Sequence, residues 1–534
     1  MVLKVQYTTM YRFHCGFRAD KELLSPQEMA VGHDRKSLRN PQRKLILSVG
    51  NIMKKVIVLI TILIGCQILN AQDYQKAIDK ARFLIRQHKN QTKIPGIQVA
   101  LMVDDSLIWS EGFGYSNLNG EVPIDLTTKF RIASVSKSVT SVALGKMIEQ
   151  KEIDIDKDIN TYLPEFPKKS FSITSRQLAA STSGIRHYTN NDPDYNTTNY
   201  PNIISSLERF KDDHLLFEPG KAYHYSSYGW VLLSAVMEKA SNKPFEQIME
   251  ESWNKLGMTH TSFDFPDKEI PNKSIQYIAG KKDERIEAPF DNRSYMYAGG
   301  GYLSTAEDLV LMGSQLLNEK YISKETVDLL FSTYHLKDNT KTNYGLGWEC
   351  GINRMNTSIV YHSGSMSSAR SHLVIFPEEK IVFAYLSNTG DNIFFNEREA
   401  HSIAELFLEE PTSEELANKV IGEWEINTTS LRNKKTSGIL RLRENMRGVI
   451  EGSITFKRSR KKKTFPVILN GVKNNQFHLV AVTPMFLDIY LTVNGDKGNG
   501  TWLHDFNVNG TPETDEYWKP RILTAKRKTF SNNK

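Results

Sequence analysis

Ser134 and Lys137 are residues whose types and spacing could do nucleophilic chemistry. Apolar residues recur after them at helical steps of three and four, which predicts a helix from about Ser134 to Gln150. Residues three apart on a helix lie side by side, so a partly desolvated lysine amine could remove the proton of the serine hydroxyl. Ser134 is therefore a candidate nucleophile at the start of a helix.

The pattern Ser-x-x-Lys is weak evidence by itself. It recurs at Ser252/Lys255 and Ser459/Lys462, and an isolated match is usually an exposed helix turn. A working site also needs a group that passes the proton to the leaving atom, and donors that hold an oxyanion. Other stretches of the chain must supply them.

Tyr225-Ser226-Ser227 is a candidate for the proton-carrying group. The stretch follows the turn signal Pro219-Gly220 and precedes a helix that we expect to begin near Val231. A tyrosine whose pKa is lowered by a neighbouring ammonium can act as a base, although Tyr225 taken alone is more often a packing aromatic.

His362-Ser363-Gly364-Ser365 is a candidate for the oxyanion donors, at the end of a predicted strand. Glycine there would allow a substrate backbone to approach closely, and the N–H of Ser365 could join that of Ser134 in holding an oxyanion. The alternative is a strand that ends in a tight turn. The joint occurrence of the three stretches, in this order, is what favours a site.

Together these motifs resemble those of the penicillin-recognising serine hydrolases, the superfamily of class C β-lactamases, S12-type serine peptidases and related esterases. Ser134-x-x-Lys137 matches the first motif, Tyr225-x-Ser227 the second (usually Tyr-x-Asn) and His362-x-Gly364 the third (usually Lys-Thr-Gly). The chain looks most like the branch of mitochondrial serine β-lactamase-like proteins and their bacterial relatives. Further matching stretches are 133–138, 183–188, 225–229, 298–305 and 344–348. The resemblance covers roughly residues 75–408.

The resemblance implies an acyl-enzyme mechanism that needs no metal and no organic cofactor. Ser134 would attack a carbonyl, Lys137 and Tyr225 would manage its proton, and water would release the acyl group. The N–H groups of Ser134 and Ser365 would hold the oxyanion. The residues expected to line the cleft are Ser227, His362, Gly364 and the glycines 299–301, while Arg186 and His187 are expected to be structural.

Two departures from the family pattern bear on the substrate. Ser227 stands where many β-lactamases have asparagine, whose side chain offers an amide both a donor and an acceptor. His362 replaces a permanently charged lysine, which weakens the case for gripping a carboxylate. We therefore expect a peptidase or an amide or ester hydrolase acting on a small molecule or peptide. True β-lactamase activity is the alternative, and a non-catalytic penicillin-binding-like scaffold is a second one.

The elements around the motifs predict an α+β domain at residues 73–410. A helix at 74–88 and strands at 97–103 and 106–112 precede a mostly helical middle, and strands and a helix return at 345–409. The resemblance implies a β-lactamase/transpeptidase-like fold, with an antiparallel sheet flanked by helices and a helical subdomain.

A small all-β domain is predicted at residues 417–525, after a polar, proline-bearing linker at 411–416. Seven strand-like runs at roughly ten-residue spacing are typical of a barrel or sandwich. Gly422-Glu423-Trp424 resembles the opening of lipocalin-like barrels. The basic run Lys457–Lys463 is interpreted as a solvated hairpin tip. The expected strands are 420–426, 439–442, 449–456, 465–469, 477–482, 487–493 and 501–506.

The formal charge of the 534-residue chain is +7, but its excess is local. Residues 1–71 hold eleven of the 68 basic and four of the 61 acidic residues, which leaves 57 of each sign in the remainder. A length of 534 residues indicates two or more domains. The equal numbers of basic and acidic residues after residue 71 argue against a role in binding nucleic acid.

Residues 53–71 have the three regions of a secretory signal peptide: two lysines, an apolar run and a small residue at the end. The run is shorter than the ~20 residues that span a bilayer, so we expect no stable membrane span. We expect an exported protein, periplasmic or secreted, with residues 1–52 as a non-native upstream extension. A lipoprotein anchored at Cys66 is the alternative. A homo-oligomer is compatible with the sequence.

Overall fold

The structure is a computed structural model that describes residues 74–189, 192, 198–281, 284–353, 356–390, 397–408, 414–429, 435–458, 461–473, 475–483, 486–503 and 521–528. The predicted upstream extension 1–52, the signal peptide 53–71 with Cys66, and residues 411–413 of the predicted linker lie outside the described residues. Within the described residues, no helix is long and apolar enough to cross a membrane.

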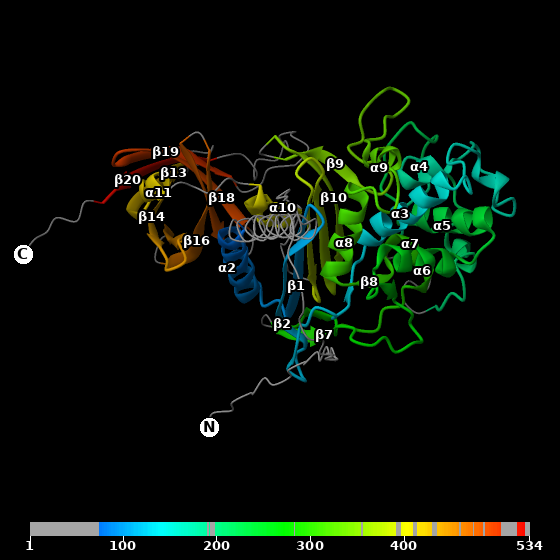
Figure 1. Cartoon of the computed structure of the whole chain (residues 1–534), viewed down its shortest axis with the longest axis horizontal. Coiled ribbons are helices and arrows are strands. Elements are labelled where there is room, and N and C mark those ends of the chain that lie inside the picture. Colours follow the sequence, from blue (N-terminus) through cyan, green and yellow to red (C-terminus); the bar gives the residue numbers. More distant parts are fainter. Residues whose placement is uncertain are drawn as a thin grey trace, which may run out of the picture. The chain divides into compact units, whose positions relative to one another are not determined.

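The first domain is built on a seven-stranded antiparallel sheet. Its strands are β1 (Gly96–Val103), β2 (Ser106–Asn117), β3 (Val122–Pro123), β9 (Glu349–Ile352), β10 (Ser358–Met366), β11 (Ala369–Phe376) and β12 (Ile381–Ser387). Their order is β3-β2-β1-β12-β11-β10-β9, which puts β1 beside β12 and pairs Ile97 with Ser387. Figure 1 labels β1, β2, β9 and β10 of this sheet. The two central strands of the sheet thus come from opposite ends of the domain sequence.

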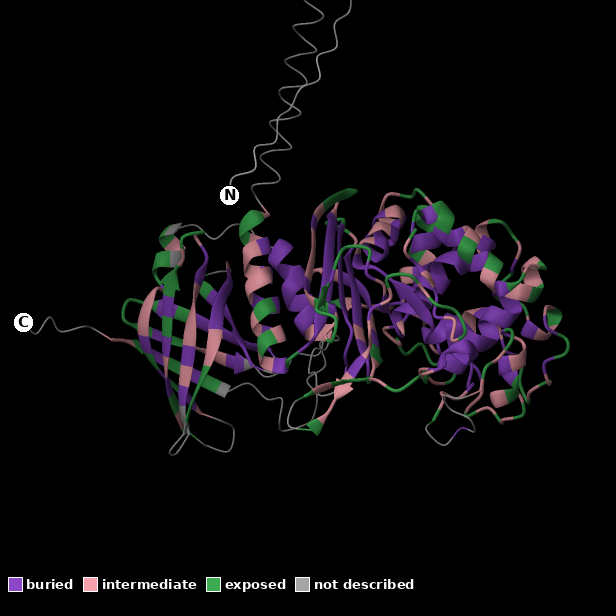
Figure 2. Ribbon diagram, turned by 90° about the horizontal axis from the view of Figure 1, so that it is seen from below, coloured by how far each residue is buried: buried purple, intermediate pink, exposed green. Residues whose placement is uncertain are grey.

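Helices cover both faces of this sheet. The helices of the described residues are α2 (Gln75–Thr92), α3 (Val135–Glu149), α4 (Ser175–Ala179), α5 (Ser227–Ser241), α6 (Phe245–Leu256), α7 (Tyr297–Gly300), α8 (Ala306–Leu317), α9 (Lys324–Phe331), α10 (Glu397–Ala404) and α11 (Glu414–Asn418). Of these, α3 and α8 pack on one face of the sheet, and α2 and α10 on the other. Side chains alternate along a strand, so Ala100 and Met102 of β1 join the core with α3 and α8, while Val99 and Leu101 join a second core with α2 and α10. Figure 2 shows how much of the sheet and its central helices is buried.

Most of the segment between β3 and β9 forms the predicted helical subdomain, with α3 at its centre. Residues Val135 to Gly145 are buried all round the helix rather than along one face, which is typical of a helix in the middle of a core. Small elements complete this part: β4 (Phe130–Arg131), β5 (Ser262–Phe263), β6 (Tyr277–Ala279), β7 (Arg285–Glu287), β8 (Tyr302–Ser304), and the 3₁₀ turns Ile159–Thr161, Ser205–Arg209 and Ser294–Met296, with Glu405–Phe407 after α10.

The C-terminal strands close into the predicted barrel, which has eight strands. They are β13 (Gly422–Thr429), β14 (Lys435–Glu444), β15 (Ile450–Arg458), β16 (Lys461–Lys473), β17 (Gln476–Val482), β18 (Phe486–Asn494), β19 (Lys497–Leu503) and β20 (Arg521–Arg527). The seven expected runs correspond to β13–β19. β20 was not expected, and it closes the barrel by pairing with both β13 and β19.

Candidate active site

Ser134 lies directly before α3, in a turn that holds it against the helix. The preceding Ala133 has φ +44, a left-handed backbone conformation that is uncommon for residues other than glycine. The N–H of Lys137 donates to the Ser134 carbonyl at 3.0 Å, and Ser134 keeps part of its surface exposed. The hydroxyl is therefore fixed by the start of the helix and accessible from outside.

Lys137 is fully buried behind Ser134. Its Nζ lies 3.2 Å from Ser134 Oγ and 2.9 Å from Ser227 Oγ, and it also donates to the Gly299 carbonyl. Burial lowers the pKa of Lys137 well below its usual value, and no carboxylate of the described residues forms an ion pair with it. An amine in this environment favours its neutral form, which is the form that can accept a proton.

Tyr225 lies against the same pair. Its side chain hydrogen-bonds with that of Ser134, and the Lys137 Nζ lies 4.8 Å from the centre of its ring. We expected an ammonium to lower the pKa of Tyr225, and this expectation is wrong: burial raises that pKa well above its usual value. Because Lys137 is itself desolvated, it does not act as a fixed cation here, and Tyr225 remains a phenol.

Ser227 is the first residue of α5 and lies behind the lysine. Its hydroxyl accepts from Lys137, and its N–H donates to His187 Nδ1 at 3.0 Å. His187 packs beside Tyr225 with ring centres 5.7 Å apart, and Arg186 forms ion pairs with Asp213 and Asp192. These contacts agree with the structural role expected for Arg186 and His187.

His362, Gly364 and Ser365 lie on β10. His362 is buried: its Nδ1 bonds to the Ser363 carbonyl at 2.7 Å and its Nε2 lies 3.1 Å from the Tyr344 hydroxyl. The carbonyl can only accept, so Nδ1 carries the proton and Nε2 accepts from Tyr344. Burial lowers the pKa of His362 to about 3, so the third motif carries a neutral side chain. Ser365 is exposed near the end of the same strand.

Gly364 admits the chain's own backbone, where we had expected it to admit a substrate. A Cβ at this position would lie 2.4 Å from the Ile132 carbonyl and 2.1 Å from Ser371 Oγ. Since Ile132 immediately precedes Ala133 and Ser134, the glycine lets β10 pack against the start of α3. The placement of Ser134 beside β10 therefore depends on glycine, which has no Cβ, at position 364.

Replacing Gly364 by alanine is expected to destabilise the fold by about 1–3 kcal/mol and to slow modification of Ser134, because the start of α3 must move. Gly300→Ala is the matched control, since a Cβ there meets its nearest neighbour at an ordinary 3.5 Å. Urea unfolding and labelling of Ser134 with a fluorophosphonate measure the two effects. Equal behaviour of the two variants would contradict the packing argument.

Two buried histidines, His88 and His362, and the half-buried His187 should make the fold sensitive to acid. Burial lowers the pKa of His88 and His362 to about 3 and that of His187 to about 4, from an ordinary 6.5. Below pH 6.5 these histidines become protonated in the unfolded chain, whereas they stay neutral in the folded chain. The free energy of unfolding should therefore fall on acidification from about 6.5 to 4, by up to ~1.4 kcal/mol per pH unit for each histidine.

His187→Asn tests this dependence, because an asparagine oxygen can accept from the Ser227 N–H as His187 Nδ1 does. Urea unfolding at pH 7 and pH 5 should give a smaller loss of stability for the variant than for the wild type. The same loss in both proteins would show that His187 does not resist protonation.

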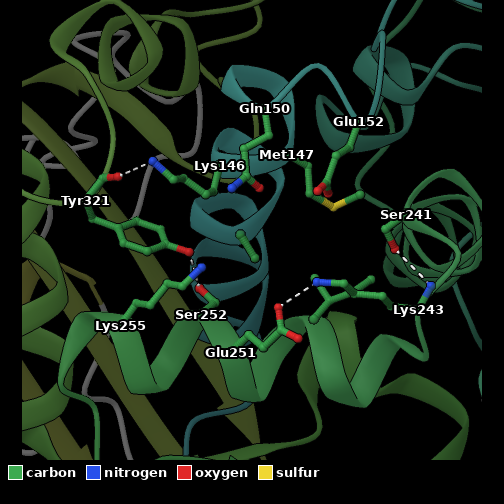
Figure 3. Close-up of a pocket in the computed structure, with 12 residues that line it drawn as sticks. Lys146, Met147, Gln150, Glu152, Ser241, Lys243, Glu251, Ser252, Lys255 and Tyr321 are labelled. Atoms are coloured by element: carbon green, nitrogen blue, oxygen red, sulfur yellow. Dashed lines mark hydrogen bonds and ion pairs between the residues drawn. The ribbon is translucent and has the colours of Figure 1, made fainter.

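The second Ser-x-x-Lys match has a different environment. Ser252 of α6 is buried and accepts a hydrogen bond from the Tyr321 hydroxyl at 3.0 Å, while Lys255 is exposed (Figure 3). Both line a small pocket of about 70 Å³ beside the later turns of α3, together with Lys146 and Met147. The spacing alone therefore does not create the arrangement found at Ser134. Ser459 of the third match lies outside the described residues.

Sequence reasoning missed two participants. We expected the glycines 299–301 to shape a wall, but the Gly299 carbonyl accepts from Lys137. Tyr344 was noticed as part of a matching stretch, and the structure shows its hydroxyl against His362. A backbone carbonyl gives no signal in a residue pattern, whereas a tyrosine within a family motif does.

Solved structures of the same fold come from penicillin-binding proteins and β-lactamases. An octameric penicillin-binding protein homologue from Pyrococcus abyssi superposes with a TM-score of 0.55 at 19% identity, covering 84% of this chain and 99% of that one. A class C β-lactamase superposes with a TM-score of 0.53 at 17% identity, covering 62% and 95%. At these identities the likeness concerns the fold.

Curated relatives are more similar in sequence. The serine beta-lactamase-like protein LACTB, mitochondrial, is 28% identical in Mus musculus and 29% in Homo sapiens, covering 58% and 57% of this chain and 74% and 73% of those proteins. Protein flp of Staphylococcus aureus strain N315 is 26% identical over 59% of this chain and 63% of its own length.

The prediction of an exported protein, periplasmic or secreted, is contradicted by these relatives. The mouse, human and Bos taurus proteins are all named as mitochondrial. A lysine pair followed by an apolar run describes several kinds of N-terminal segment, so the pattern at residues 53–71 was too general to decide a destination.

The family model described as Beta-lactamase matches residues 81–407. This match spans more than half of the chain and includes all three motifs, from Ser134 on α3 to Gly364 on β10. It confirms the resemblance drawn from those motifs, and it agrees with the solved structures of the same fold. The chain belongs to the Beta-lactamase family.

Proposed function

We propose that this protein is a serine hydrolase that forms an acyl-enzyme on Ser134 and cleaves a peptide, amide or ester bond. The observation that carries the proposal is the contact between Lys137 Nζ and Ser134 Oγ at 3.2 Å, with the lysine fully buried and its pKa lowered. A neutral amine there takes the hydroxyl proton as Oγ attacks the substrate carbonyl.

Tyr225 completes the proton balance. Because its pKa is raised, it begins the reaction as a phenol and acts as an acid. Tyr225 donates its proton to the leaving nitrogen or oxygen, and the proton that Lys137 took from Ser134 replaces it. Water then attacks the acyl group by the reverse use of the same groups, which regenerates the Ser134 hydroxyl.

The N–H groups of Ser134 and Ser365 are proposed to hold the oxyanion. A two-residue turn joins β10 to β11, with Met366 paired to Ala369 and Ser365 to Arg370. Hydrogen-bonded and non-bonded pairs alternate in an antiparallel ladder, so a bonded pair at the turn leaves the Ser365 N–H pointing away from β11. On that side β9 pairs with β10 from Ser358 to Tyr361 and does not reach Ser365.

The substrate is proposed to be a small molecule or peptide that needs no carboxylate at the third motif. His362 is neutral and its two nitrogens are already bonded to Ser363 and Tyr344, so it offers no positive charge. This argument favours amides, peptides and esters over the carboxylate-bearing β-lactams.

A substrate panel tests the proposal. Purified full-length protein is mixed with a D-amino-acid amide, short peptides, an aryl ester and a cephalosporin, and the Ser134 peptide is examined by mass spectrometry. The proposal predicts an acyl adduct on Ser134 with turnover of amides, peptides or esters. Turnover of the cephalosporin alone would establish a true β-lactamase instead, and no adduct with any compound would leave a binding scaffold.

We also propose that the chain forms a homo-oligomer. The Pyrococcus abyssi homologue is described as octameric, and it superposes over 84% of this chain. Light scattering coupled to size-exclusion chromatography should give a mass that is a multiple of 61.0 kDa or of the processed chain. A monomeric mass across the working concentration range would refute this part of the proposal.

A further inference from the structure

One hydrophobic cluster spans the boundary between the barrel and the hydrolase domain. Ile78 and Leu84 of α2 and Ile403 of α10 belong to the same buried cluster as Val480 of β17 and Phe486 of β18. The barrel also has a core of its own, which includes Trp424 and Leu440. Its boundary with the hydrolase domain is nevertheless apolar, whereas loosely joined domains usually meet through a more polar boundary. The barrel is therefore packed against α2 and α10, the two helices that cover one face of the main sheet.

A buried polar network also joins α10 to the barrel at this boundary. Arg398 of α10 forms an ion pair with Asp488 of β18, and their side chains are 11% and 3% exposed. Asp488 also lies 2.7 Å from His478, which in turn lies 3.1 Å from Asn470. Phe486 donates its N–H to Glu399 at 3.1 Å. Breaking an ion pair with so little solvent contact costs free energy, because it leaves a buried charge without its partner. The barrel therefore holds α10 firmly.

The residue before Arg398 connects α10 to β10. Glu397 accepts a hydrogen bond from Ser363 Oγ at 2.8 Å. Ser363 lies between His362 and Gly364 and two residues before Ser365, so this bond reaches the part of β10 where β9 no longer pairs with it. Through Glu397, α10 therefore contacts the segment of β10 that packs at Gly364 against the start of α3.

We infer that the barrel positions β10, the strand that carries the proposed oxyanion donor Ser365. Asp488 of the barrel holds Arg398, the adjacent Glu397 holds Ser363, and Ser363 fixes β10 beside Ser134. This inference deepens the proposed function and rests on it for its kinetic consequence. Asp488, Arg398, Glu397 and Ser363 are positioning residues, because they act on the reacting atoms through β10. Oxyanion donors stabilise a transition state when they are already in place, so a looser β10 should lower kcat more than it raises KM.

Two substitutions at opposite ends of the connection provide the test. Ser363→Ala removes the hydroxyl on β10 that bonds to Glu397. Asp488→Asn removes the negative charge of the barrel that pairs with Arg398 of α10. Each is expected to lower kcat about tenfold with KM nearly unchanged, and the double variant should lose little more than either single one, because both act through α10. Ser363→Thr keeps a hydroxyl on a strand and should restore most of the activity.

Arg447→Ala is the matched control for the interface. Arg447 also joins the barrel to the first domain, through an exposed ion pair with Asp79 of α2. Among the described residues it forms no hydrogen bond or ion pair with α10. This variant should keep the wild-type kcat. Melting temperatures of all variants identify any that fail to fold.

Hydrogen exchange of the β10 peptide gives a readout that does not depend on activity. Faster exchange of the amides at residues 363–366 in Asp488→Asn, with no change in Arg447→Ala, supports the inference. Unchanged exchange in a folded Asp488→Asn, or losses that multiply in the double variant, would overturn it. A wild-type protein that forms no adduct at Ser134 refutes the proposed function, and the exchange result still decides whether the barrel holds β10.

Discussion

Ser134→Ala is expected to abolish labelling by a fluorophosphonate and to lower turnover of any amide or ester substrate by roughly 10⁴- to 10⁶-fold, because the attacking oxygen is removed. Ser134 is partly exposed and lies directly before the first turn of α3. Its hydroxyl contacts Lys137, whose Nζ keeps its bonds to Ser227 and Gly299 in the variant. The melting temperature should therefore change little.

The control for this experiment is Ser252→Ala. Ser252 and Lys255 have the same spacing as Ser134 and Lys137, but Lys255 is exposed, and Ser252 bonds to Tyr321. Labelling and turnover should survive in Ser252→Ala. Loss of labelling in this variant, or retained labelling in Ser134→Ala, would move the nucleophile elsewhere. A large drop in the melting temperature of Ser134→Ala would mean that its hydroxyl is structural.

Lys137→Met is expected to slow acylation by about 10²- to 10⁴-fold, the usual contribution of a general base. Burial lowers the pKa of Lys137, so the neutral amine that accepts the proton becomes available well below pH 10.5. The rate of acylation should rise with pH through that lowered pKa and then level off. Lys137→Arg should not restore activity, because a guanidinium remains charged.

The pH profile of Ser134 labelling tests whether the base is Lys137, as proposed, or Tyr225. If Lys137 is the base, Tyr225→Phe should lower the plateau while the midpoint stays at the wild-type pH. A wild-type rate that continues to climb to pH 10 would mean that the lysine keeps its ordinary pKa. A midpoint that disappears in Tyr225→Phe would assign the base to the phenol.

The fold could be predicted from the sequence wherever the signal was periodic and local. The helix after Ser134, the outer helix α2 and seven barrel strands were expected from patterns of apolar residues. β20 was missed because it lies well after β19 in the sequence and begins with only a short alternating run. In the structure it pairs with both β13 and β19. The returning strands were expected to begin at residue 345, but the first of them, β9, begins at Glu349, because the residues just before it form turns.

The candidate site was predictable in its residue types but not in their protonation. Motif spacing brought Ser134, Lys137, Tyr225 and Ser227 to attention, and the structure brings these four side chains into one cluster. The pKa of Tyr225 was expected to fall and instead rises. That direction depends on how deeply the tyrosine and lysine are buried, and burial is a property of the assembled core. The substrate and the individual catalytic roles remain predictions.

The central pairing of β1 with β12 has a consequence for how the protein reaches this state. Ile97 pairs with Ser387, so the middle of the sheet joins positions about 290 residues apart. During synthesis, β1 and its hairpin partner β2 leave the ribosome long before β12 exists, and their apolar faces stay uncovered meanwhile. High contact order of this kind slows folding and exposes intermediates to aggregation, so we expect chaperone dependence in cells and poor refolding from denaturant at high protein concentration.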